Sequence, residues 1–120
     1  MSPADPASAA PSPKPRGRRA FTLNVGGQKL KVEWAQIEAY GMYFYDEQRI
    51  VINESLQVDS ALFVETLRHE MIHAAFSISG LSFGWTTEQE EQVVRCLDGI
   101  FFPAWEKVLT NVRKQQSTAA

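Results

Sequence analysis

The two histidines of the chain, His69 and His73, lie in a five-residue window, His69-Glu70-Met71-Ile72-His73, which has the pattern HExxH. Residues four apart on an α-helix lie on the same face, so both imidazoles can reach one metal ion. The glutamate of this pattern is placed to polarise a metal-bound water. The spacing therefore predicts a zinc site with His69 and His73 as ligands and Glu70 as the general base of a hydrolysis.

Each residue of the window also has an ordinary interpretation, because HExxH occurs by chance in helices. His69 and His73 would then be common helix residues, and Glu70 a solvated acid. However, the window uses every histidine of the chain and lies inside residues 62–79, which have helical periodicity of their own. These observations favour metal binding.

A catalytic zinc site takes three protein ligands and keeps one position for water. No third histidine exists, so the third ligand must be a thiol or a carboxylate. Cys96, the single cysteine, falls in the apolar stripe of the following helix, where a small buried thiol is commonplace. That helix opens with three acids, Glu88, Glu90 and Glu91.

Helical spacing separates the candidate carboxylates. The residues that follow Glu90 at helical spacing are apolar, so Glu90 shares the core-facing stripe, whereas the face of Glu91 is mixed. Glu90 could instead close a capping box if Thr87 is the N-cap. If Thr86 is the N-cap, Gln89 takes that role and Glu90 turns inward. Glu90 is the predicted third ligand, and Glu91 is the alternative.

The residues before the motif alternate with the period of β-strands. Phe21–Val25 and Leu30–Trp34 flank Gly26-Gly27, which is the pattern of a hairpin. Residues 42–45 and 49–53 predict a second strand pair around a polar turn. Ile50–Asn53 is interpreted as an open edge that could pair with an extended peptide. Three tyrosines, Tyr40, Tyr43 and Tyr45, are candidates for stabilising an oxyanion, with no means of choosing among them.

Helical patterns occupy the second half of the chain. Asp59 or Ser60 can cap the motif helix, and Gly80 can end it. A second helix starts after Trp85, and Pro103 is expected to kink or break it. The predicted fold class is α+β, with a small antiparallel or mixed sheet of about three to four strands packed on the HExxH helix and a C-terminal helix.

Composition sets the broad class. Of the 120 residues, 44% are hydrophobic, which supports one domain over residues 20–112. Residues 1–19 are rich in Pro, Ala and Ser and predict a disordered basic arm, and residues 113–120 predict a flexible tail. The arm alone is weak support for nucleic-acid binding, because the remaining chain is acidic. One cysteine, no apolar run of membrane-spanning length and no export signal predict the cytoplasm, without a membrane partner.

Residues 21–109 resemble minimal zincin metallopeptidases of the glutamate-ligand (gluzincin) kind. The resemblance rests on His69-Glu70-Met71-Ile72-His73-Ala74 followed by Glu90-Glu91-Gln92-Val93-Val94, in the order strands, HExxH helix, second helix. These two segments look like those of small phage- or prophage-encoded metallopeptidases, and their order along the chain is similar to that of the ImmA/IrrE class. The resemblance implies His69, His73 and Glu90 as zinc ligands and Glu70 as the catalytic base. The SprT/Spartan type also starts in this way, but it uses a third histidine that this chain lacks.

The leading hypothesis is thus a zinc metallopeptidase, a hydrolase acting on a protein or peptide substrate. The alternative is a zinc-stabilised interaction module without enzymatic activity, which could belong to a phage. Retention of Glu70 favours the enzyme, because a purely structural site needs only ligands.

Overall fold

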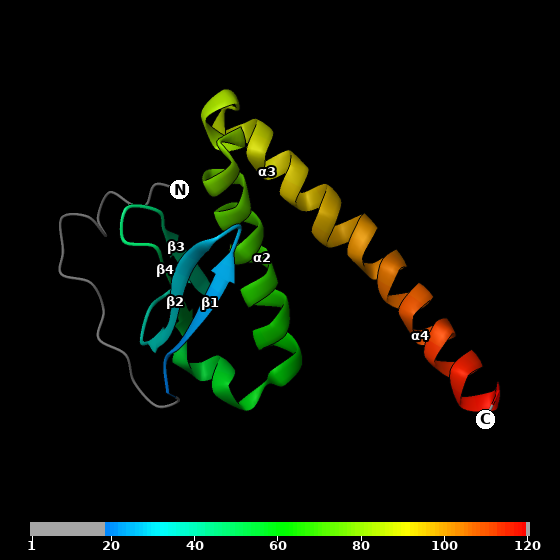
Figure 1. The fold of residues 1–120 in the computed structure, drawn as a ribbon. Helices are drawn as coiled ribbons and strands as arrows, with labels where there is room; N and C mark the ends of the chain where they lie inside the picture. Colours follow the sequence, from blue (N-terminus) through cyan, green and yellow to red (C-terminus); the bar gives the residue numbers. More distant parts are fainter. Residues whose placement is uncertain (1–18, 120) are drawn as a thin grey trace. The chain divides into compact units, whose positions relative to one another are not determined.

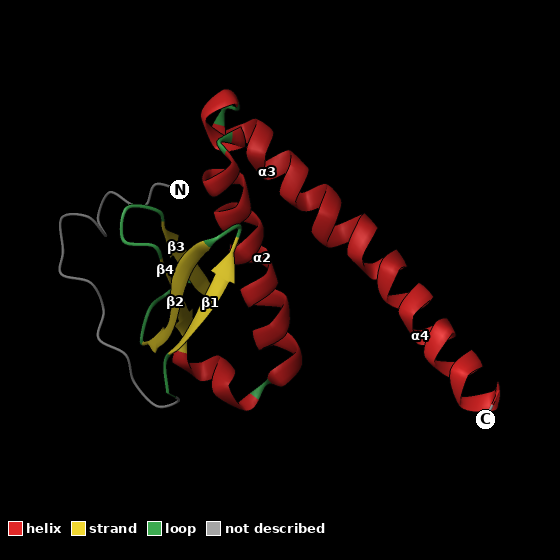
Figure 2. Cartoon of the chain, in the orientation of Figure 1, coloured by secondary structure: helices red, strands yellow, loops and turns green. Residues whose placement is uncertain are grey.

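Residues 19–119 are described by the structure, a computed structural model in which four strands precede the main helices (Figures 1 and 2). The strands are β1 (Phe21–Val25), β2 (Gln28–Ala35), β3 (Gly41–Phe44) and β4 (Arg49–Asn53). The 3₁₀ turns are η1 (Glu54–Val58) and η2 (Leu81–Gly84), the helices are α2 (Ser60–Ser79), α3 (Thr87–Cys96) and α4 (Phe102–Ala119), and η3 (Leu97–Phe101) is a π-helical turn. The predicted α+β class is confirmed. The predicted basic arm lies outside the described residues, apart from Arg19.

The hairpin between β1 and β2 is closed by Gly26 and Gly27. Both glycines have positive φ, 57° and 85°, as the central residues of a type I′ turn require. The side-chain oxygen of Asn24 accepts a hydrogen bond of 3.0 Å from the amide of Gly27. The hairpin predicted from the Gly-Gly pair is therefore confirmed.

The four strands form one mixed sheet in the order β1-β2-β4-β3. β2 and β4 are parallel, whereas the β1–β2 and β3–β4 pairs are antiparallel. β4 is thus paired on both sides, and the interpretation of Ile50–Asn53 as an open edge is wrong. The edge on this side of the sheet is β3, because the chain passes from β2 to β3 and returns to fill the place between them with β4.

One face of the sheet carries the main core. Alternate residues of β2 and β4 point to this face, and α2 lies along it (Figure 1). The buried members are Leu30, Val32, Trp34, Ile50, Ile52, Leu56 and Ala74. Phe63 of α2 packs on Trp34 with ring centroids 4.6 Å apart. The strands present apolar side chains at every second residue and α2 presents them at helical spacing, so apolar contacts hold the motif helix on the sheet.

The other face of the sheet combines a small apolar cluster with a buried ion pair. Ala35, Phe44 and Val51 form the cluster. Nε of Arg49 donates to the carboxylate of Glu33 at 2.8 Å, and both side chains are more than nine-tenths buried. The buried carboxylate of Glu33 depends on Arg49, because an unpaired charge in this place would lose its hydration without compensation.

The contacts along the chain divide it into two compact units, with the boundary in the sequence between Trp85 and Thr86. In the second unit, α3, η3 and α4 follow one another as a nearly continuous run of helix (Figure 2). Pro103 was expected to kink or break the helix, and the break is wrong: the helix continues past it after the π-helical turn, in which the amide of Phe102 donates to the carbonyl of Leu97. Proline has no amide to donate, and a wider turn accommodates this within the helix. Residues 113–119, for which a flexible tail was expected, belong to α4.

None of the helices within residues 19–119 is both long enough and apolar enough to cross a membrane.

Candidate metal centre

The motif helix α2 has well-defined ends. The side chain of Asp59 accepts a hydrogen bond of 3.0 Å from the amide of Leu62, and Gly80 ends the helix with a left-handed φ of 88°. Of the two predicted caps, Asp59 is therefore the one used. These ends give a helix of 20 residues in which the HExxH window lies well away from either terminus, where fraying would move the side chains.

His69 and His73 lie side by side on α2. Their ring centroids are 5.1 Å apart, and the rings meet edge to face at 66°. Both side chains are half-buried, so neighbouring residues restrict the rings while solvent can still reach them. Two imidazole nitrogens held in this way are suited to one divalent metal such as zinc, whose bonds to histidine measure about 2.0–2.1 Å.

Glu70 is buried, with only 9% of its surface exposed. It is no solvated surface acid, which was its ordinary interpretation. Its side chain lies against the start of β3, since a Cβ built on Gly41 would be 3.1 Å from Cγ and 3.4 Å from Oε2 of Glu70. A carboxylate in this position is screened from bulk water but adjoins an edge strand.

Gly41 is a site residue that the sequence interpretation missed. A Cβ at this position would also lie 2.8 Å from Cγ2 of Thr66, closer than real Cβ contacts come. β3 can therefore approach α2 this closely only because residue 41 has no side chain. The available signal was a glycine at the start of a strand, which often marks a close approach of backbones.

The start of α3 settles the question of its cap. Thr86 is the N-cap: its hydroxyl accepts from the amide of Gln89 at 3.0 Å, and the side chain of Gln89 accepts from the amide of Thr86 at 2.9 Å. This capping box uses Gln89, so Glu90 does not close it. Glu90 and Glu91 are both half-buried, whereas Glu88 is exposed. Glu88 is thus the least suited of the three acids to a metal site.

Two further groups of candidate residues have defined places. Cys96 is exposed, so its expected burial in an apolar stripe is wrong. Adjacent residues of a helix point about 100° apart, so Cys96 points away from the stripe to which its neighbour Leu97 belongs. Among the tyrosines, Tyr40 and Tyr45 are 59% and 62% exposed. Tyr43 packs against the core instead. None of the three is brought into a described contact with Glu70.

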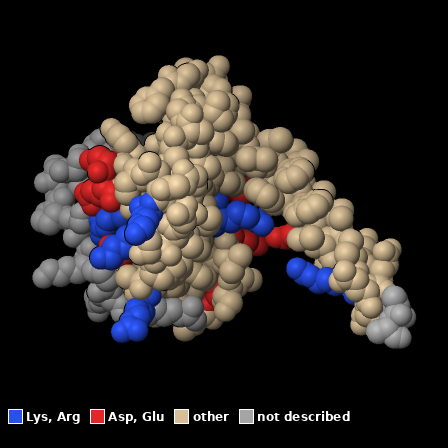
Figure 3. All heavy atoms as spheres, viewed as in Figure 1, with Lys and Arg blue, Asp and Glu red and all other residues tan. Residues whose placement is uncertain are grey.

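The face of the molecule drawn in Figure 3 gives no support to a nucleic-acid site. The face drawn in Figure 3 carries both Lys or Arg and Asp or Glu side chains, with uncharged surface between them. Binding to a phosphate backbone relies on basic side chains gathered on one surface.

Comparison of the chain with protein-family models, with curated proteins and with solved structures finds no match.

Proposed function

We propose that this protein is a zinc-dependent metallopeptidase that hydrolyses a peptide bond in a protein or peptide substrate. One observation carries the proposal. α2 holds two imidazoles side by side, and the residue between them in the motif is a glutamate buried against an edge strand. Two ligands beside a general base are what a hydrolytic metal site needs from one helix.

The ligand set fits zinc. Two histidines and one glutamate are a known set for catalytic zinc, with the fourth position left for water. When bound, the ion would act as a Lewis acid on the water and on the scissile carbonyl. His69, His73 and Glu91 are a group of side chains that could hold one ion. We therefore propose Glu91 as the third ligand. Glu90, which the periodicity of the sequence favours, is the alternative that the experiment must test.

Glu70 supplies the proton transfers in this proposal. Its carboxylate takes a proton from the attacking water and passes it to the leaving amine. Contact with β3 restricts the side chain to few positions, so the carboxylate is already in place when substrate arrives. Burial also keeps bulk water away from the transfer.

The substrate would bind as an extended strand along β3. Within residues 19–119 this strand pairs with β4 on one side only, so the backbone groups of its other side could bind a peptide. Because Gly41 adjoins Glu70, a peptide paired with β3 would pass close to the base. The short length of β3 would confine the pairing to a few residues of the substrate.

The cytoplasm is the compartment we propose, since a chain with one cysteine needs no oxidising surroundings.

The second candidate function is a zinc-stabilised interaction module without activity. The exposed apolar residues of α4 favour it, because they form the kind of surface that binds proteins.

The metal is tested first, by measuring zinc per chain by mass spectrometry of the purified protein. We expect about one zinc in wild type, as for a single-site protein. His73→Ala and Glu91→Gln should lose most of it, and Glu90→Gln, the matched control one residue away, should keep it. Loss in Glu90→Gln with retention in Glu91→Gln would assign Glu90 instead. A wild type that binds no zinc would overturn the proposal.

Activity is tested with the same protein and a peptide library. Wild type should cleave, and Glu70→Gln should keep its zinc but lose at least about 100-fold in rate, the usual size of a general-base contribution. Zinc binding without cleavage by wild type would favour the interaction module. Equal cleavage by both proteins would exclude Glu70 as the base.

A further inference from the structure

The apolar side of the second unit has no role in the proposed chemistry. Phe101, Trp105, Val108 and Val112 follow one another at spacings of four, three and four, so they lie on one side of the helix. They are 50%, 46%, 45% and 42% exposed, and the rings of Phe101 and Trp105 are stacked with centroids 6.4 Å apart. Leu109 lies within the same stripe and is half-buried. We call this set the α4 stripe.

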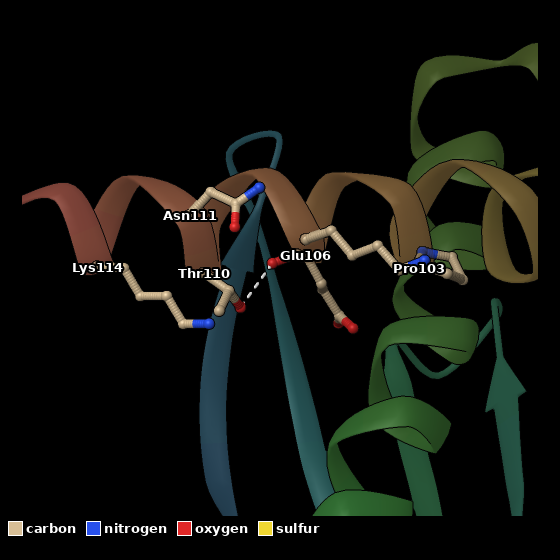
Figure 4. A pocket seen from close by; sticks show the side chains of 6 residues that line it. Pro103, Glu106, Thr110, Asn111 and Lys114 are labelled. Atoms are coloured by element: carbon tan, nitrogen blue, oxygen red, sulfur yellow. Dashed lines mark hydrogen bonds between the residues drawn. The ribbon is translucent and has the colours of Figure 1, made fainter.

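The opposite side of α4 is polar. Pro103, Glu106, Lys107, Thr110, Asn111 and Lys114 line a pocket there, and the hydroxyl of Thr110 donates to the carbonyl of Glu106 at 3.0 Å (Figure 4). The helix is thus apolar on one side and hydrated on the other. An exposed apolar surface of this extent marks a site of interaction.

We propose that the α4 stripe binds the α4 stripe of a second copy of the chain, in antiparallel orientation. The argument is charge complementarity. Glu106 and Arg113 lie three residues before and four residues after Leu109, so both lie where the polar side of the helix meets the stripe, on the same edge. Around a twofold axis near Leu109, Glu106 of each copy faces Arg113 of the other, and two ion pairs form.

A parallel pair offers no such match. In a parallel arrangement the border with Glu106 and Arg113 faces the opposite border of the other helix. That border carries Ala104 and Asn111, which have no charge. The charges that flank the stripe therefore favour the antiparallel pair.

Nearly the same axis suits the shapes of the apolar residues. Trp105 and Val112 are equally far from a point between Val108 and Leu109, one residue before the midpoint of Glu106 and Arg113. Each Trp105 would thus pack against the smaller Val112 of the other copy, and two bulky side chains would not compete for one place. A twofold pair of this kind closes on itself and produces a dimer.

Sedimentation equilibrium of the full chain tests the proposal. Wild type should be dimeric at about 100 µM, a concentration at which an interface of low micromolar Kd is largely formed. Trp105→Glu should be monomeric, whereas Lys107→Glu, a charge change on the polar side, should remain dimeric. Circular dichroism verifies that each variant keeps its helices.

Charge reversal tests the orientation without disturbing the stripe. Glu106→Arg alone and Arg113→Glu alone should each raise the dimer Kd about tenfold, because each turns both ion pairs into repulsions. The double variant should recover most of the wild-type Kd. Independently, in a Cys96→Ser background, Leu109→Cys should form an interchain disulfide on oxidation, and Phe101→Cys should not.

Several results would overturn the proposal. They are a wild type that is monomeric at all concentrations, a double variant no better than the single ones, and a disulfide through Phe101→Cys instead of Leu109→Cys. In a monomeric wild type, a lower melting temperature of Trp105→Glu would show that the chain itself covers the stripe. Cosedimentation of that monomer with anionic lipid vesicles would assign the stripe to a membrane surface instead. The proposal does not depend on zinc or on activity.

Discussion

The helices α2 and α4 have similar lengths and both carry an apolar side, but only α2 buries it in the described structure. The side chains of α2 pack on the sheet, with Phe63 against Trp34, and this packing holds the motif residues in place. In the stripe of α4, Phe101, Trp105, Val108 and Val112 remain 42–50% exposed. Helical periodicity therefore shows that a helix has an apolar side, but the partner of that side must be found by other means.

The largest effect is expected in the core contact of α2. Phe63→Ala should lower the free energy of unfolding by about 3 kcal/mol, because it removes a ring packed between helix and sheet. Urea unfolding followed by circular dichroism measures it, and the loss should not vary with protein concentration. The matched control is the neighbouring Val64→Ala. Val64 is 55% exposed, so its change should stay within about 0.5 kcal/mol. Equal losses in both variants would contradict the burial of this side of α2.

A smaller effect is expected where α2 meets the edge strand. Gly41→Ala should cost about 2 kcal/mol of unfolding free energy, because the added Cβ would stand 2.8 Å from Cγ2 of Thr66. Thr66→Ser removes that methyl group, so the double variant Gly41→Ala/Thr66→Ser should recover part of the loss. The same urea titration measures all three proteins. Strictly additive losses would show that the two residues do not compete for this space.

The smallest effect is expected in α4, and it should depend on concentration. For Trp105→Ala in dilute protein, the free energy of unfolding should change by about 0.5 kcal/mol or less, as for other half-exposed side chains. At higher concentration the wild type should gain in melting temperature over the variant, because association stabilises the folded chain. Differential scanning calorimetry over a range of concentrations distinguishes the two cases. A difference that is constant over this range would place the contact within one chain and remove the contrast with α2.

The sequence predicted the features that depend on neighbouring residues. The Gly26-Gly27 turn, the cap at Asp59 and the stop at Gly80 are each decided within one turn of the chain, and all three are confirmed. The strand order was not predicted, because the position of β4 between β2 and β3 depends on pairing between distant residues. The close approach at Gly41 has the same origin.

The candidate site was predicted in part for the same reason. The pairing of His69 with His73 follows from helix geometry alone. The choice between Glu90 and Glu91 does not, since adjacent residues of a helix point about 100° apart and the one used depends on how α3 packs. The course of the helix through Pro103 could not be foreseen either, because a π-helical turn has no simple sequence signal.

The short length of β3 has a consequence for the behaviour of the protein at high concentration. An unpaired strand edge can join the edges of other molecules and start aggregation. With four residues, β3 offers too little backbone for a stable sheet to extend from one molecule to the next. A protein with this edge can therefore leave it open to short peptides and still resist the growth of fibrils from it.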